Sequence, residues 1–133
     1  MVEHESMANF AYQDSEGYWT IAIGRCIDRR RGEGLSDDEC LYLLNNDIKK
    51  AINDLKDYSW YQIQNEVRQY VLIEMHIEMG LEGLLKFRDM LSALNYKNYI
   101  VASNAMASSE WAKQVSKDRV NNMRFRMMRG TYP

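Results

Sequence analysis

The chain has 133 residues, a formal net charge of −2 and an apolar fraction of 46%, values that favour one globular domain and exclude a disordered or fibrous chain. Its isoelectric point near 5.7 shows that the chain lacks the excess of positive charge that would attract a polyanion, so we expect no nucleic-acid partner. No run approaches the roughly 20 apolar residues of a membrane span, and residues 1–10 lack the apolar stretch of a secretory signal. With two cysteines and two histidines, we expect a monomer without metal, cofactor or disulfide framework, made in a reducing cytoplasm.

Turn signals dominate the first 34 residues. Four of the seven glycines fall between Gly17 and Gly34. Asp14-Ser15-Glu16-Gly17 is a turn sequence, and the run Tyr18–Ile23 after it is rich in aromatic and β-branched residues, as strands are. Together with residues 10–12 before the turn, this run predicts a small β-hairpin.

The remainder of the chain is expected to be helical, because only two glycines and no proline interrupt residues 35–129. Ser36–Glu39 has the form of a capping box, and the apolar spacing that follows predicts an amphipathic helix over residues 37–56. Further helices are predicted around Val67–Met75 with a stop at Gly80, over 84–91 and 97–106, from Ser109, and from Ser116 to just before Gly130. We expect the methionines, including Met75, Met79, Met123, Met127 and Met128, to fill the core, and His76 to be a hydrogen-bonded core or rim residue.

Three polar residues near the hairpin are candidates for chemistry. Glu5 precedes the hairpin, Asp14 lies at its turn and Thr20 follows on the returning strand. Cleavage of a glycosidic bond needs one protonated carboxyl that gives a proton to the leaving oxygen, and one ionised carboxylate that activates water or attacks the sugar. Residue types alone leave the alternative open that Asp14 is an ordinary turn residue and Glu5 a solvated charge.

The ordered set of motifs resembles the phage-type lysozymes, or endolysins, which are glycoside hydrolases that cut bacterial peptidoglycan. In that family nine residues separate a glutamate from the aspartate of an Asp-x-x-Gly turn, and Thr-Ile-Gly-x-Gly follows. Glu5 and Asp14 have that separation, and Thr20-Ile21-Ala22-Ile23-Gly24 follows in register. The similarity continues through segments that cover nearly the whole chain: Gly34–Glu39, Leu43–Ile48, Glu78–Gly80, Gly83–Phe87, Trp111–Val115, Arg119 and Met127–Pro133.

The resemblance implies an α+β fold that is mostly α. A small N-terminal lobe with a β-hairpin (residues 1–35) would be joined by a long helix (36–56) to a helical C-terminal lobe (57–133), all within one lysozyme-like domain. It also implies an ion pair between Arg25 and Asp47, which would pin the hairpin to the long helix.

The implied activity is that of a muramidase, which hydrolyses the β-1,4 bond between N-acetylmuramic acid and N-acetylglucosamine with inversion. By the same resemblance Glu5 is the general acid, Asp14 positions or activates water, and Thr20 helps to hold that water. The implied substrate-binding residues are Gly24, Cys26 and Ile77. Peptidoglycan is then the partner, and an enzyme without a signal sequence would accumulate in the host cytoplasm and reach the wall through a separate pore.

Several positions depart from the family pattern. Ser6 and Ala22 stand where the family has glycine, Ile77 and Glu78 replace an aromatic and an amide, and only four residues precede Glu5. These departures support an alternative function, that of a non-catalytic lysozyme-like module that binds peptidoglycan or belongs to a virion.

Positive charge is concentrated in residues 113–129, which carry six cations against Asp118, a net charge of +5. Such a segment could steer the protein to an anionic cell-envelope surface or act on membranes directly. The same pattern also fits an ordinary solvated helix.

Overall fold

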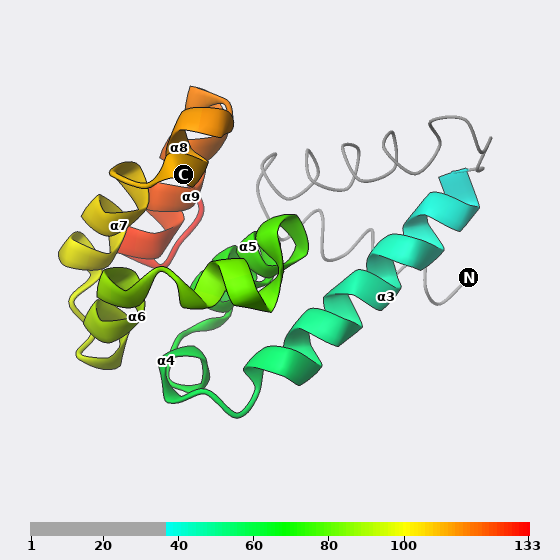
Figure 1. The fold of residues 1–133 in the computed structure, drawn as a ribbon, viewed down its shortest axis with the longest axis horizontal. Helices are drawn as coiled ribbons and strands as arrows, with labels where there is room; N and C mark the ends of the chain where they lie inside the picture. The colour runs from blue at the N-terminus through cyan, green and yellow to red at the C-terminus, as the bar shows by residue number, and fades with distance from the viewer. Residues whose placement is uncertain (1–36) are drawn as a thin grey trace.

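The computed structural model describes residues 37–133, and all regular structure in that part of the chain is helical (Figure 1). The described helices are α3 (Asp37–Leu55), α4 (Ser59–Gln62), α5 (Glu66–Leu85), α6 (Arg88–Asn95), α7 (Tyr99–Ala107), α8 (Glu110–Gln114) and α9 (Lys117–Arg129). The predicted hairpin and the rest of the proposed N-terminal lobe lie outside the described residues. The described region is therefore mostly helical, as the sequence predicts.

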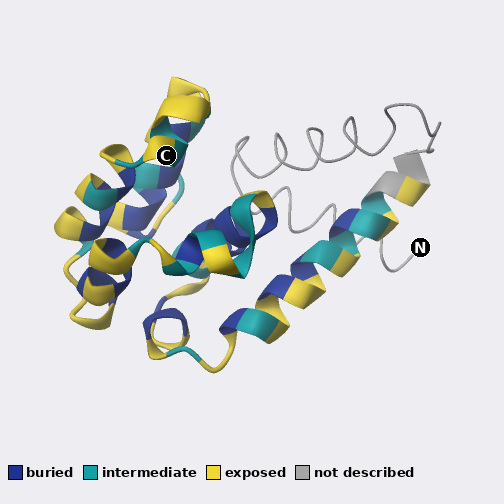
Figure 2. Cartoon of the chain, in the orientation of Figure 1, coloured by how far each residue is buried: buried dark blue, intermediate teal, exposed yellow. Residues whose placement is uncertain are grey.

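Helix α3 confirms the predicted amphipathic helix. Leu44, Ile48, Ala51 and Leu55 are buried along one face, and this face packs against α5. Figure 2 shows the buried stripe alternating with exposed residues along the helix. Ile52, which also belongs to the apolar spacing, is 39% exposed, so the contact with α5 is narrower than the spacing suggests.

Helix α5 is the central element of the described core. It begins after Asn65, whose side chain accepts a hydrogen bond of 3.0 Å from the backbone N–H of Arg68. Every residue from Tyr70 to Ile77 is buried, because neighbouring helices cover several sides of α5. Gly80 interrupts the helix with φ 75° and ψ 170°, a conformation that is essentially restricted to glycine. The predicted stop at Gly80 is thus a break, after which one more turn extends to Leu85.

Three of the four C-terminal helices, α7, α8 and α9, begin after a residue whose side chain caps them. The side chains of Asn98, Ser109 and Ser116 each accept a hydrogen bond from a backbone N–H in the first turn of α7, α8 and α9. Gly130 ends α9 in the left-handed conformation. Helix α7 packs against both α6 and α9, and Figure 1 shows these elements gathered on the side of α5 away from α3.

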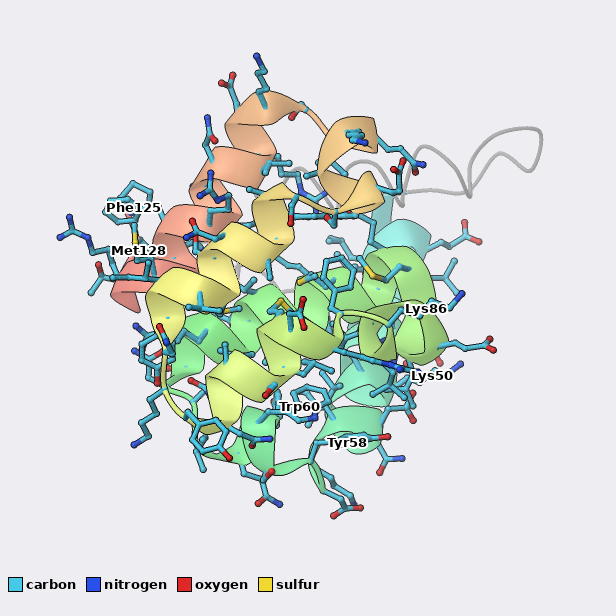
Figure 3. All side chains as sticks on the ribbon, turned by 60° about the vertical axis from the view of Figure 1, so that its left-hand side comes forward. Lys50, Tyr58, Trp60, Lys86, Phe125 and Met128 are labelled. Carbon is cyan, nitrogen blue, oxygen red and sulfur yellow. The ribbon has the colours of Figure 1, made fainter. Side chains whose placement is uncertain are left out.

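Helix α4 is absent from the sequence-based prediction, because four residues are too few to show a helical period. The N-cap residue of α4, Tyr58, makes no capping hydrogen bond through its side chain, and packing of aromatic residues stabilises the helix instead. Trp60 and Tyr61 are buried, and the ring of Trp60 stacks on that of Tyr58 at 4.7 Å between centroids. Figure 3 shows the side chains of Tyr58 and Trp60 together in the lower part of the view.

One hydrophobic cluster extends from Leu44 in α3 to Met127 in α9. The expectation that methionines fill the core is confirmed for Met75, Met123 and Met127, which are fully buried. It is wrong for Met128, which is 38% exposed and extends outward from α9 beside Phe125 (Figure 3). Successive residues of a helix point about 100° apart, and in α9 this turn carries Met128 out of the buried face that Arg126 and Met127 occupy.

Candidate functional site

Most of the predicted site residues belong to the N-terminal segment. Glu5, Asp14, Thr20, Gly24, Arg25 and Cys26 lie outside the described residues. Their proposed roles stay predictions, and so does the Arg25–Asp47 ion pair, of which only Asp47, half-buried on α3, is described. The described part of the candidate site is the end of α5 near Gly80 and the helices that contact it.

Ile77 lies on α5 three residues before the break at Gly80. Its side chain is 8% exposed and belongs to the hydrophobic cluster. Contact between Ile77 and a substrate therefore stays a prediction, and it would have to use the small exposed fraction of the side chain or the backbone at the helix break.

The next residue, Glu78, connects three helices. The indole N–H of Trp111 at the start of α8 donates a hydrogen bond of 2.6 Å to Glu78 Oε2. The guanidinium of Arg119 in α9 forms an ion pair with Glu78 Oε1. The edge of the Trp111 ring also contacts Phe87 at 6.4 Å between centroids. Glu78 thus fixes Trp111 and Arg119 beside the break in α5.

Arg119 retains hydrogen-bonding capacity in this arrangement. Its side chain is 10% exposed, and its Nε and Nη2 atoms are buried with no hydrogen-bond partner among residues 37–133. A guanidinium keeps its charge at any ordinary pH, so Arg119 can orient an oxygen or an anion but cannot act as a general acid or base. The two remaining donors give the candidate site a fixed cation next to Glu78.

The sequence places Trp111 among the segments similar to the family and Arg119 in the basic segment, and it does not predict that the two side chains meet at Glu78. No local signal predicts this meeting, because Glu78 is an exposed residue, and water can solvate its carboxylate without a protein partner.

A family model for phage lysozyme matches residues 2–127. The chain belongs to the phage lysozyme family. The match extends over the predicted catalytic residues and through most of α9. The expected resemblance is thereby confirmed at the level of the family.

Curated relatives of the chain come from a phage and from an amoeba. It is 26% identical to the pre-baseplate central spike protein Gp5 of Enterobacteria phage T4, over 90% of the chain but 25% of that protein. It is 23% identical to probable T4-type lysozyme 1 of Dictyostelium discoideum, over 77% of the chain and 76% of the relative. Probable T4-type lysozyme 2 of the same organism is 24% identical, over 80% of the chain and 78% of the relative. The chain therefore spans about a quarter of the spike protein and about three quarters of each lysozyme.

Three of the six cations in the basic segment contact other parts of the protein, and the other three, Lys113, Lys117 and Arg129, are exposed. Arg126 is fully buried and paired with Glu74 of α5, and Arg119 is paired with Glu78. Arg124 donates hydrogen bonds to the backbone oxygen and the hydroxyl of Ser103. The +5 charge of the sequence therefore overstates what this segment presents to a partner, because two of its cations are paired with carboxylates of α5.

Two further features concern metal binding and membrane spans. Among residues 37–133 there is no group of three or more histidine, cysteine, aspartate or glutamate side chains placed to hold a metal ion. Within the same residues, no helix has the length and apolar character needed to cross a membrane.

Proposed function

We propose that the chain is a muramidase that hydrolyses the β-1,4 bond between N-acetylmuramic acid and N-acetylglucosamine in bacterial peptidoglycan. The family match over residues 2–127 carries this proposal, because the matched segment contains Glu5 and Asp14 at the family's nine-residue separation. Two relatives named as probable T4-type lysozymes support the same activity.

In the proposed mechanism Glu5 is protonated and gives its proton to the glycosidic oxygen as the bond to the sugar carbon breaks. Asp14 is ionised and takes a proton from the water that attacks that carbon, and Thr20 holds the water. Inversion requires the carboxyls to be roughly 6.5–9.5 Å apart, so that water fits between them and the sugar. Apolar surroundings that raise the pKa of Glu5 would keep it protonated near neutral pH.

The proposal includes the division of the chain into lobes at residues 1–35 and 57–133, with the helix of residues 36–56 between them. Gly24, Cys26 and Ile77 are the proposed substrate contacts. The proposed biological role is host lysis, with the enzyme made in the host cytoplasm and released to the wall through a separate pore.

Clearing of purified peptidoglycan tests the activity. We expect Glu5→Gln to reduce the clearing rate at least about a hundredfold, because the amide has no proton to give to the leaving oxygen. Asp14→Asn should cause a similar loss. Glu3→Gln makes the same chemical change two residues earlier and should clear at the wild-type rate.

An equal rate for Glu5→Gln and the wild type would overturn the assignment of the general acid. Absence of clearing by the folded wild type would favour the alternative, a non-catalytic module that binds peptidoglycan or belongs to a virion. That alternative is kept because one relative is a pre-baseplate central spike protein.

A further inference from the structure

A groove of about 570 Å³ lies between α6 and α7, the two helices that run side by side at one edge of the molecule (Figure 1). This volume is within the range of pockets that hold small organic ligands. None of its lining residues belongs to the proposed hydrolytic site. The groove is lined by Asp89, Ser92, Ala93, Tyr96, Asn98, Val101, Asn104, Ala105 and Ser108.

Tyr96 supplies an aromatic surface at this groove. Its side chain is 83% exposed, the largest value among the exposed large apolar residues of the described chain. The turn that follows contains Lys97 with φ 56°, a conformation that costs a non-glycine residue about 1–2 kcal/mol. Tyr96 and Asn98, the residues on each side of Lys97, both line the groove. The turn is a common helix ending, in which the backbone N–H groups of Lys97 and Asn98 donate to the carbonyl oxygens of Leu94 and Ala93. It presents the ring of Tyr96 to solvent beside the groove.

Two amide groups in the groove are held in one orientation. Asn98 Oδ1 accepts a hydrogen bond of 3.3 Å from the backbone N–H of Val101, and Asn104 Oδ1 accepts one of 3.3 Å from Arg124 Nη2. The –NH₂ end of each amide is thereby left as a donor for a ligand. Within the described chain, the carboxylate of Asp89 and the hydroxyl of Ser92 make no side-chain hydrogen bond, so both can accept from hydroxyl groups.

The charge of the lining restricts the ligand. The lining residues contain one carboxylate and no lysine or arginine, so an anionic ligand is disfavoured. Ala93, Val101 and Ala105 add small apolar surfaces to the same groove. A ligand that fits this lining would be uncharged, rich in hydroxyl groups and able to accept a hydrogen bond from an amide N–H. It would also place one apolar face against the ring of Tyr96 and its methyl groups against the aliphatic side chains of the lining.

We propose that the groove between α6 and α7 is an accessory carbohydrate site that binds the uncharged β-1,4-linked N-acetylhexosamine backbone of a glycan strand. Tyr96 stacks on a sugar ring, and the amides of Asn98 and Asn104 donate to acetamide or ring oxygens. Asp89 and Ser92 accept from sugar hydroxyls. The choice of glycan rests on the proposed function, whereas the chemistry of the ligand rests on the lining residues.

Titration of the full-length Glu5→Gln protein with chitotetraose, an uncharged β-1,4 N-acetylglucosamine oligomer, tests the site. In ¹H–¹⁵N NMR spectra we expect saturable shifts of the side-chain amide signals of Asn98 and Asn104. In Tyr96→Ala the Kd read from these signals should rise about tenfold, since the stacking surface is lost. Tyr96→Phe retains the ring and should bind like its parent, and Tyr42→Ala removes an exposed tyrosine of α3 as a matched control.

Absence of saturable shifts at the groove signals would overturn the proposal, as would equal Kd values in the parent and in Tyr96→Ala. Shifts with a free stem peptide but not with chitotetraose would also overturn it and assign the groove to peptide. The outcome is separable from that of the proposed function. Groove shifts do not require hydrolysis, and clearing that depends on Glu5 does not require the groove.

Discussion

At the scale of single residues, the main feature is a fully buried ion pair between Glu74 and Arg126, which joins α5 to α9. Arg126 Nη1 also donates a hydrogen bond of 3.2 Å to Asn122 Oδ1, and its guanidinium lies 5.4 Å from the ring of Tyr132. A buried pair of this kind contributes little relative to an apolar replacement, but loss of one partner leaves a charge without compensation.

Glu74→Gln should therefore lower the free energy of unfolding by about 3 kcal/mol, measured by urea denaturation at neutral pH. Glu82→Gln makes the same change at an exposed position of the same helix and should alter stability by less than about 0.5 kcal/mol. The double variant Glu74→Met/Arg126→Met should recover much of the loss. If Glu74→Gln were as stable as the wild type, the pair would not be the compensated charge that its burial indicates.

Individual residues also show what the sequence could not predict. The count of cations in residues 113–129 is correct, but it cannot say which of them face inward. Arg126 looks like a solvated residue until α5 brings Glu74 against it, 52 positions earlier in the chain. For His76, in contrast, the prediction from the sequence agrees with the structure. Its expected role as a hydrogen-bonded core or rim residue is confirmed by 6% exposure and a contact of 2.8 Å between its Nε2 and Asp54 Oδ2.

At the scale of elements, the helices and their ends are largely predictable, because caps and apolar spacing are local signals. Ser109, Ser116 and Gly130 delimit α8 and α9 as expected. The break in α5 is predictable from Gly80. The single helix predicted over residues 84–91 is wrong in its bounds, because Leu84 and Leu85 end α5 and a separate helix, α6, begins at Arg88. The meeting of Glu78, Trp111 and Arg119 depends on how three helices pack and has no local signal.

Gly80→Ala tests the break directly. A Cβ atom at Gly80 would contact no atom of residues 37–133 within 4 Å, so the expected cost is conformational, about 1–3 kcal/mol. Thermal or urea unfolding measures it. Ser92→Ala changes an exposed helical residue that makes no side-chain hydrogen bond in the described chain and should be nearly neutral. An unchanged stability for Gly80→Ala would mean that the backbone at this position is not confined to the conformation seen here.

At the scale of the whole molecule, attachment of α3 to the helical body depends on one narrow apolar face. The contact is supplemented at its C-terminal end by the Asp54–His76 interaction between α3 and α5. In the proposed architecture α3 is the helix between lobes, so its attachment decides how firmly the N-terminal residues are held to the helical body.

Ile48→Ala should destabilise this attachment by about 2–4 kcal/mol, because Ile48 is 3% exposed and the substitution leaves a cavity against α5. Ile52→Ala is the matched control on the same helix, at 39% exposure, and should cost well under half as much. Urea unfolding gives the energies, and amide hydrogen exchange in α3 shows where the loosening occurs. Equal effects of the two substitutions would contradict the packing of α3 described above.

Hydrogen bonds attach the end of the described chain to the start of α5. Asn65 Nδ2 donates a hydrogen bond of 2.9 Å to the backbone oxygen of Gly130, and Arg68 donates to the backbone oxygens of Met127 and Met128. The start of α5 thus acquires its partners only after residue 130 has been synthesised. During translation the face of α5 that packs against α9 stays uncovered until residues 117–130 emerge from the ribosome, so we expect the nascent polypeptide to be prone to aggregation until that stretch has been made.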